Sequence, residues 1–185
     1  MKIKLIEQLN VLIVEGDRHM RMLIREMLFA LGVKDVAVAS DGKAAVEEMQ
    51  VFRSDLVLVD LKMEPIGGLE FVRRLRADTK NPYRFVPVIM ITAYADLDTV
   101  AMARDVGITE FMAKPISATI LQQRIERVLK DSRRFVEAPE FTGPDRRRSS
   151  KKTALEGKER RETLPKFVDP PEDLPAAPKS PETKL

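Results

Sequence analysis

Residues 56–60 read Leu-Val-Leu-Val-Asp, four branched aliphatic residues that end in a single carboxylate. A short run of this kind is typical of a strand that is buried on both faces of a sheet, because no polar side chain interrupts it. The chain contains four further runs like it, and a longer segment with a different periodicity follows each one. The strands expected from these runs are residues 11–14, 36–39, 56–59, 88–91 and 110–112.

Between these runs, apolar residues recur at steps of three and four, which is the period of a helix with one apolar face. The first helix can end at Gly32, and the fifth can begin with Ser117 as its cap. Strands that alternate with helices predict an α/β fold, here a doubly wound (βα)5 flavodoxin-like parallel sheet. The apolar faces expected for the five helices comprise Met20, Leu23, Ile24, Met27 and Leu28; Ala45, Val46 and Met49; Leu69, Phe71, Val72 and Leu75; residues 100–106; and Ile120, Leu121, Ile125, Val128 and Leu129.

The composition excludes several classes of protein. The 185 residues include no cysteine, so disulfides and cysteine-ligated metals are excluded. No run of apolar residues is long enough to span a membrane, which needs about 18 of them. We therefore expect a soluble, cytoplasmic protein without a membrane span.

The chain divides by composition after residue 131. Residues 132–185 contain 13 Lys and Arg against 10 Asp and Glu, so they carry the whole net charge of +3, and they hold eight of the 12 prolines. Dense charge with few apolar residues predicts a disordered, Pro-rich tail that follows one domain at residues 1–131. Because the domain itself is neutral and no helix-turn-helix segment follows it, we expect no DNA-binding domain.

The tail contains two basic stretches, residues 133–135 and 144–148. Arginine beside an aromatic or in a run is able to bind RNA, an acidic protein or anionic lipid. A solvated tail that binds nothing is an equally good interpretation of the same residues.

Polar side chains follow four of the five expected strands. The first strand is followed by Glu15 and Asp17, the third by Asp60, the fourth by Thr92 and the fifth by Lys114. Each residue alone has an ordinary interpretation as a helix cap, a strand end or a solvated turn. Since the carboxyl ends of parallel strands meet at one edge of a sheet, the four strand ends together predict a binding site there.

These residues make the chain resemble the bacterial response-regulator receiver family over residues 8–131. That family has an acidic pair after its first strand, aspartate after the third, Ser or Thr followed by Ala after the fourth, and Lys-Pro after the fifth. The corresponding residues are Glu15-Gly16-Asp17, Asp60, Thr92-Ala93 and Lys114-Pro115. The steps of 45 residues from Glu15 to Asp60 and of 22 residues from Thr92 to Lys114 are also similar to those of the family.

The resemblance implies a chemotaxis-type single-domain receiver, which is a signalling protein rather than a dedicated enzyme. Asp60 would accept a phosphoryl group from a histidine kinase, a histidine phosphotransfer protein or a small phosphodonor, and water would later hydrolyse the acyl phosphate. Thr92 and Lys114 would contact the phosphoryl oxygens. Phe111 and Thr92 would form the switch that reports phosphorylation to an unidentified downstream protein; a plain core residue is the alternative for Phe111.

The resemblance also implies a bound Mg²⁺, held by Glu15, Asp60 and the backbone carbonyl of Lys62, with Asp17 as a further candidate ligand. Gly16 departs from the family pattern, because it replaces a usual acidic ligand and supplies no carboxylate. We therefore expect weaker Mg²⁺ binding than in a typical receiver. The alternative function is a pseudo-receiver, a scaffold that binds partners and signals without phosphorylation.

Two further features concern single residues. Lys62 and Tyr94 lie two residues beyond Asp60 and Thr92, where they are expected to hinder the hydrolytic water and prolong the phosphorylated state. His19, the single histidine, lies off the apolar face of the first helix and is expected on the surface. No partner histidine exists for catalysis or metal binding.

Overall fold

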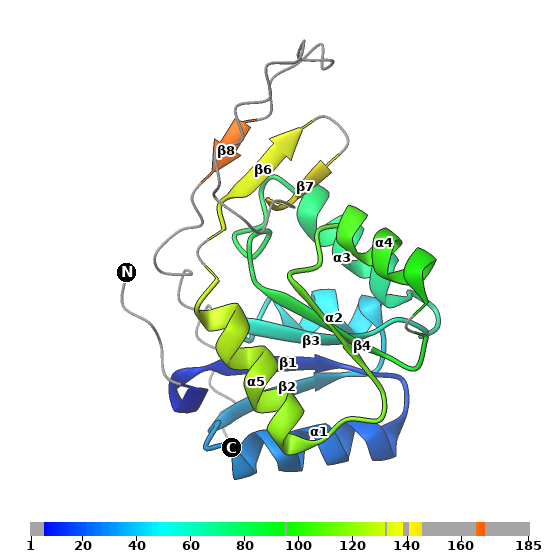
Figure 1. Ribbon diagram of the computed structural model, residues 1–185, viewed down its shortest axis with the longest axis vertical. Coiled ribbons are helices and arrows are strands. Elements are labelled where there is room, and N and C mark those ends of the chain that lie inside the picture. The colour runs from blue at the N-terminus through cyan, green and yellow to red at the C-terminus, as the bar shows by residue number, and fades with distance from the viewer. Residues whose placement is uncertain (1–5, 95, 132, 139–140, 146–165, 169–185) are drawn as a thin grey trace, which may run out of the picture.

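The computed structural model of the protein describes residues 6–94, 96–131, 133–138, 141–145 and 166–168. A central sheet lies between two layers of helices, with a smaller sheet at one end (Figure 1). None of the helices in these ranges is long and apolar enough to cross a membrane.

The central sheet confirms the predicted fold class. Its strands are β1 (Asn10–Val14), β2 (Asp35–Ala39), β3 (Leu56–Asp60), β4 (Val88–Thr92) and β5 (Glu110–Ala113). They lie in the order β2-β1-β3-β4-β5, and every neighbouring pair is parallel. The chain moves outward from β1 to β2 and then returns to β3, so the direction of winding reverses between β1 and β3. Each strand contains the run predicted for it.

One helix follows each strand, namely α1 (Arg18–Ala30), α2 (Gly42–Glu48), α3 (Gly68–Ala77), α4 (Leu97–Asp105) and α5 (Ala118–Leu129), and a short 3-10 turn, η1 (Ile6–Gln8), precedes β1. The predicted caps are confirmed. The Ser117 hydroxyl accepts a hydrogen bond from the amide of Ile120, and Gly32 follows α1 with a φ of 90°, a conformation that suits glycine.

The strands bury alternate residues against opposite helical layers. On one face, Val11 and Ile13 belong to a cluster with residues of α1 and α5. On the other face, Leu12 and Val14 belong to a cluster with residues of α2, α3 and α4. Because both faces of the sheet are covered, the strands have no polar face, which explains their continuous apolar runs.

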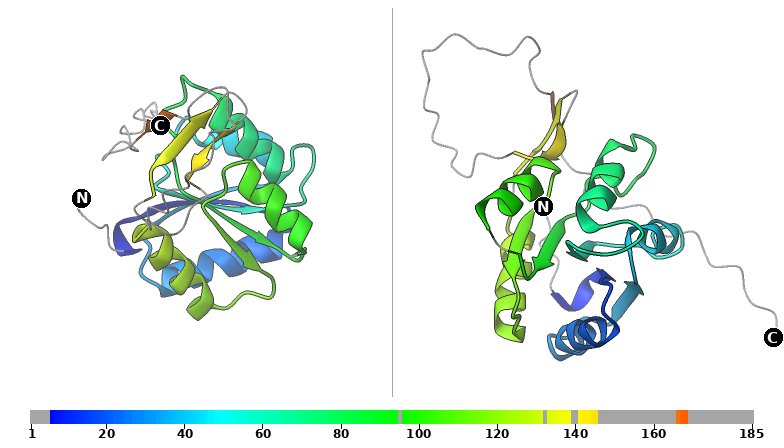
Figure 2. Two further views of the ribbon diagram at one scale, coloured as in Figure 1. Left: turned by 45° about the horizontal axis from the view of Figure 1, so that its top comes forward. Right: turned by 90° about the vertical axis from the view of Figure 1, so that its right-hand side faces the viewer.

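A second, antiparallel sheet of three strands follows α5 (Figure 2). It consists of β6 (Phe135–Ala138), β7 (Phe141–Pro144) and β8 (Lys166–Val168), in the order β7-β6-β8. The structure here differs from the disordered tail predicted after residue 131, because these residues are folded. The rest of that segment, including residues 146–148, lies outside the described residues.

The small sheet is attached to the domain by close contacts that the sequence pattern does not reveal. Phe135 is 5% exposed, and its ring meets that of Phe85 edge to face at 5.2 Å between centroids. Gly107 and Gly143 bring two backbones together, since a Cβ on Gly143 would lie 2.6 Å from the Cα of Gly107. Arg133 donates to the carbonyl oxygen of Thr109 at 3.0 Å. Phe135 and Arg133 are therefore used in packing, which argues against their predicted role in binding RNA or an acidic partner.

Candidate functional site

Three of the predicted site residues meet at the carboxyl edge of the central sheet. The Nζ of Lys114 lies 2.7 Å from Glu15 Oε2 and 3.2 Å from Asp60 Oδ1. Glu15 follows β1, Asp60 ends β3 and Lys114 follows β5, so the strand order brings together residues 45 and 54 positions apart in the chain. Glu15 is only 3% exposed, and the ammonium group of Lys114 compensates its buried charge.

The electrostatics of Lys114 favour its charged form. Burial is the largest single influence and acts to lower the pKa of Lys114, but the hydrogen bonds to Glu15 and Asp60 and the negative charges of both together outweigh it and raise the pKa above its ordinary value. Lys114 is therefore a fixed positive charge at neutral pH, in contact with the carboxylate that the sequence predicts as the reactive group.

Backbone contacts hold the two neighbouring loops close to Asp60. Gly68, at the start of α3, packs so tightly that a Cβ there would lie 2.1 Å from the carbonyl oxygen of Asp60. Only glycine allows this approach, and its amide donates to the carbonyl of Leu61 at 3.0 Å. On the other side, the amide of Lys114 donates to the carbonyl of Thr92 at 2.8 Å.

The predicted switch residues lie on adjacent strands. Thr92 is 1% exposed, and its hydroxyl accepts a hydrogen bond from the amide of Tyr94 at 3.1 Å. Phe111 pairs across the sheet with Met90, and its partly buried ring packs against the cluster on the side of α2, α3 and α4. These positions do not test the switch predicted for Thr92 and Phe111, which stays a prediction.

Asp17 has a structural role at the start of α1. Its Oδ1 accepts a hydrogen bond from the amide of Met20 at 2.8 Å, which caps the helix and lowers the pKa of Asp17. Its own amide donates to Glu15 Oε1 at 3.1 Å. Asp17 is exposed, and one of its two carboxylate oxygens is already engaged, so its position favours capping over the predicted metal ligation.

Gly16 faces the loop that follows Asp60. A Cβ added to Gly16 would lie 3.7 Å from Cγ of Met63 and 4.0 Å from the carbonyl oxygen of Lys62, which are ordinary contact distances. A side chain at this position would therefore fit, and it would lie beside the carbonyl predicted to bind the metal. The carbonyls of Glu15 and Gly16 both accept hydrogen bonds from Arg21, a contact that no motif of the sequence indicated.

The oxygen donors present are few but suited to Mg²⁺. Among the described residues, no group of three or more His, Cys, Asp or Glu side chains is arranged to hold a metal ion. Two carboxylates remain, those of Glu15 and Asp60, together with the carbonyl of Lys62. Since Mg²⁺ usually keeps several waters and takes only one or two carboxylates from a protein, this set fits the ion, with one carboxylate fewer than receivers usually provide.

Comparison with known proteins agrees with this geometry. Residues 11–126 match the sequence model of a protein family, the response regulator receiver domain. The chain belongs to the response regulator receiver family. Receivers are phosphoacceptor signalling domains of two-component systems, in which phosphoaspartate and magnesium are typical.

Chemotaxis proteins are among the relatives of this receiver. It is 30% identical over 122 residues to the chemotaxis protein CheY of Pseudomonas aeruginosa, an alignment that covers 66% of this chain and 97% of that protein. It is 32% identical over 122 residues to CheY1 of Helicobacter pylori, covering 65% and 97%. The structure of the chemotaxis response regulator CheY4 of Vibrio cholerae matches with a TM-score of 0.59 and 28% identity, covering 65% of this chain and 98% of that one.

The mouth of the receiver site is bridged by two side chains from different loops. The Nζ of Lys62 lies 3.6 Å from the centroid of the Tyr94 ring, within the range of a cation–π interaction. Lys62 belongs to the loop after β3 and Tyr94 to the loop after β4, and both side chains are exposed. The sequence predicted that Lys62 and Tyr94 each lie beside the site, but their contact with one another is seen only in the structure.

Proposed function

We propose that Asp60 is the phosphoacceptor of this receiver. The observation that carries the proposal is the position of Lys114, whose single ammonium group contacts both Glu15 and Asp60. A carboxylate oxygen of Asp60 would attack the phosphorus of a phosphohistidine. The P–N bond would break, the imidazole would leave and take up a proton, and an acyl phosphate would remain on Asp60.

Lys114 and Thr92 would position and stabilise the phosphoryl group. The charge of Lys114 offsets the repulsion between an anionic phosphoryl group and the carboxylates, which is the main task of a phosphotransfer site. The Thr92 hydroxyl, which now accepts from the amide of Tyr94, would donate to a phosphoryl oxygen. Hydrolysis would follow when water attacks the phosphorus and the bond to the Asp60 oxygen breaks.

Glu15, Asp60 and the carbonyl of Lys62 are the residues that would hold Mg²⁺. When bound, the ion supplies further positive charge between the phosphoryl group and the carboxylates. Glu15 would have to share its oxygens between the ion, Lys114 and the amide of Asp17. With no carboxylate at Gly16, the affinity for Mg²⁺ would be lower than in a receiver with two acidic residues after β1.

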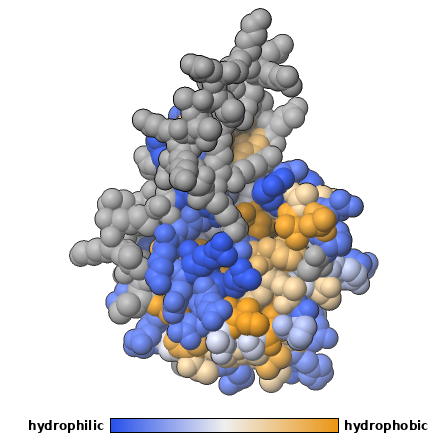
Figure 3. All heavy atoms as spheres, in the orientation of Figure 1, coloured by the Kyte–Doolittle hydropathy of each residue, from blue (hydrophilic) through white to orange (hydrophobic). Residues whose placement is uncertain are grey.

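The partners would be a histidine kinase or histidine phosphotransfer protein as the phosphodonor and a separate protein as the target. The surface of α4 suits a protein target, because Leu97 is 87% exposed and Met102 is 50% exposed. Figure 3 shows apolar side chains gathered over this helix beside a largely hydrophilic face. The protein would then be a signalling protein of the cytoplasm that transmits its signal by binding a partner, not a dedicated enzyme.

A pseudo-receiver is the second candidate function, and Gly16 is the observation that favours it. If the site holds Mg²⁺ too weakly, Asp60 would stay unphosphorylated and the protein would act through its binding surface alone. The salt bridge from Lys114 to Glu15 and Asp60 would then serve to stabilise the fold.

The test is intact-mass spectrometry after incubation with acetyl phosphate and Mg²⁺. The proposal predicts one phosphoryl group on the wild type and none on Asp60→Asn. Asp35→Asn is the matched control and should be phosphorylated like the wild type. Asp35 is exposed and begins β2, so it lies at the opposite edge of the sheet from Asp60, which ends β3. A phosphoryl group found only on a Gly16→Asp variant would identify the natural protein as a pseudo-receiver.

A further inference from the structure

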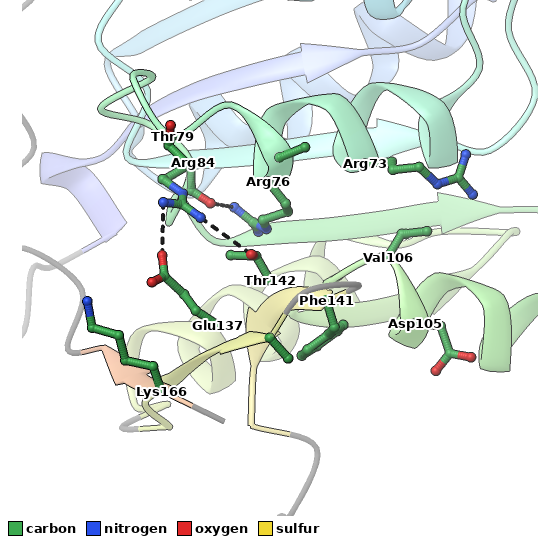
Figure 4. A pocket seen from close by; sticks show the side chains of 12 residues that line it. Arg73, Arg76, Thr79, Arg84, Asp105, Val106, Glu137, Phe141, Thr142 and Lys166 are labelled. Carbon is green, nitrogen blue, oxygen red and sulfur yellow. Dashed lines mark hydrogen bonds and ion pairs between the residues drawn. The ribbon is translucent and has the colours of Figure 1, made fainter. Parts of the chain in front are cut away.

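A groove separates the small sheet from the helices of the receiver (Figure 4). It encloses about 610 Å³ and is lined by the C-terminal parts of α3 and α4, by the segment before β4, and by residues of β6, β7 and β8. The lining residues that belong to the receiver precede β4 and β5, whereas Asp60 lies at the carboxyl end of β3, so the groove lies at the other end of the central sheet. Its volume falls within the range of about 300–1,000 Å³ that small-molecule sites occupy.

The ionic residues of the groove are mostly positive. Four cations line it against two carboxylates, and these residues are Arg73, Arg76, Arg84 and Lys166, and Asp105 and Glu137. Arg84 and Glu137 form a salt bridge at 2.8 Å, so that carboxylate is already neutralised. The same salt bridge engages Arg84, and Arg73 pairs with Glu70, so Lys166 and the buried Arg76 supply the positive charge that favours an anion.

Arg76 adds a buried positive charge behind the wall. It is 2% exposed and donates to the carbonyl oxygens of Gly107 at 3.2 Å and Val86 at 2.7 Å, and to that of Arg84. These partners are backbone carbonyls, which satisfy its hydrogen bonds without cancelling its charge. Burial lowers the pKa of Arg76 to about 9, and the nearby charge of Arg84 acts in the same direction, so the guanidinium is still charged at neutral pH.

Arg84 has one donor that the protein does not use in the described part of the chain. Its two terminal nitrogens face Glu137 and the hydroxyl of Thr142, as Figure 4 shows. Its Nε is buried and has no hydrogen-bond partner there. Buried donors are almost always paired, so the protein leaves the guanidinium group of Arg84 only partly satisfied.

The remaining lining is apolar and partly aromatic. Phe141 of β7 and Val106 at the end of α4 lie along the groove between the salt bridge of Arg84 and the far end with Asp105 (Figure 4). A site with a cationic end and a flat apolar wall is complementary to a molecule with an anionic group and a flat apolar body.

We propose that this groove binds a small organic phosphate with an aromatic body. The phosphate lies at Arg84 and Lys166, and the aromatic body packs against Phe141. A phosphate suits the site better than a carboxylate, because its second charge is matched by the exposed Lys166 together with the largely buried guanidinium groups of Arg84 and Arg76. The small sheet is then a second, ligand-binding part of the protein, independent of whether Asp60 is phosphorylated.

The experiment is a titration of the ¹⁵N-labelled full chain with adenosine monophosphate, followed by NMR. The proposal predicts saturable shifts of the amides of Thr142, which lines the groove, and of Gly107 and Gly143, which directly follow the lining residues Val106 and Thr142. Adenosine has the same aromatic body without the charge, and inorganic phosphate has the charge without the body. Each should bind at least about tenfold more weakly than adenosine monophosphate, a difference of about 1.4 kcal/mol.

Three variants connect the shifts to the groove. Lys166→Gln and Phe141→Leu should each weaken binding severalfold, whereas Lys130→Gln is the matched control and should not. Lys130 is an exposed lysine beside Glu126 of α5, away from the groove residues. The spectrum of each variant without ligand shows whether it is folded.

Three outcomes would overturn the proposal. The first is the absence of saturable shifts at Gly107, Thr142 and Gly143 up to about 10 mM adenosine monophosphate, a concentration well above the Kd of a specific binding site. The second is equal binding of adenosine. The third is a response confined to the amides of Ala93 and Lys114, because it would place the anion at the Asp60 site instead.

Discussion

Lys114 and Arg76 are two cations at opposite ends of the same sheet, and they are held in opposite ways. Lys114 contacts two carboxylates, and its pKa is raised. Arg76 contacts three backbone carbonyls, and burial lowers its pKa. Side chains can rearrange and exchange partners, whereas backbone carbonyls of a packed domain cannot.

This difference distinguishes a cation that can exchange its partners, Lys114, from a cation that holds the fold together, Arg76. A phosphoryl group on Asp60 would form an ion pair with Lys114 in place of the carboxylates, because the ammonium group only exchanges one anion for another. No comparable exchange exists for Arg76, since its removal leaves the carbonyls of Arg84, Val86 and Gly107 without a donor. We therefore expect substitutions at Arg76 to affect stability and substitutions around Lys114 to affect chemistry.

Arg76→Met should have the largest effect on stability. The change keeps the apolar stem but removes the hydrogen bonds to buried carbonyls and the contact with the ring of Phe135, 5.2 Å away. We expect the free energy of unfolding to fall by about 3–5 kcal/mol, measured by urea denaturation. Arg73→Met is the matched control on the same helix; Arg73 is exposed and pairs with Glu70, so its loss should cost less than about 0.5 kcal/mol. Equal effects of the two variants would contradict the structural role of Arg76.

Gly16→Asp should raise the affinity for Mg²⁺ by roughly tenfold. The new carboxylate has room, since a Cβ meets Met63 and the carbonyl of Lys62 only at ordinary distances, and it adds negative charge beside the proposed ligands. The measurement is a calorimetric or NMR titration with Mg²⁺, which does not depend on phosphorylation. Gly16→Asn adds almost the same volume without charge and should leave the affinity nearly unchanged. No gain with aspartate would mean that the metal, if it binds, lies elsewhere.

The strands and the polar residues at their carboxyl ends could be predicted because both follow from local sequence. The buried strands are unbroken apolar runs, and Glu15, Asp60, Thr92 and Lys114 lie at their carboxyl ends. The caps at Gly32 and Ser117 and the exposure of His19 followed from helical periodicity in the same way.

The attachment of the small sheet could not be predicted in that way. Arg73, Arg74 and Arg76 look alike in the sequence, yet the first two are exposed and pair with Glu70, while the third is buried. What distinguishes Arg76 is its contact with Gly107, 31 residues away, and with Phe135. Contacts over such separations leave no periodic signal, and the dense charge around Phe135 predicted disorder instead.

Tyr94→Ala should shorten the lifetime of the phosphorylated state by roughly three- to tenfold, a change of up to about 1.4 kcal/mol in the barrier to hydrolysis. Loss of the ring also frees Lys62, so both groups at the mouth of the site cease to hinder the attacking water. The measurement is the decay of the phosphorylated mass after removal of acetyl phosphate. Tyr94→Phe keeps the ring under Lys62 and should decay like the wild type. A wild-type half-life of only seconds would contradict the shielding role.

The smallest expected effect is a change in the pH dependence of stability on Lys114→Met. The pKa of Lys114 is raised in the folded state above its ordinary value of 10.5, so its stabilising effect is fully present below that pH and is lost as the pH rises through the folded-state pKa. The Tm of the wild type should therefore exceed that of Lys114→Met by a constant amount between about pH 8 and pH 10, and the gap should narrow at higher pH. A gap that is independent of pH would show that the carboxylates contribute nothing to holding Lys114 charged.

The most direct test of the central claim is to locate the phosphoryl group after reaction with acetyl phosphate. Borohydride reduces an aspartyl phosphate to homoserine, and peptide mass spectrometry then identifies the residue that was converted. We predict conversion of Asp60 alone in the wild type. Conversion of Glu15 or Asp17, or no conversion of Asp60 in protein that carries the phosphoryl group, would contradict the assignment of Asp60 as the phosphoacceptor.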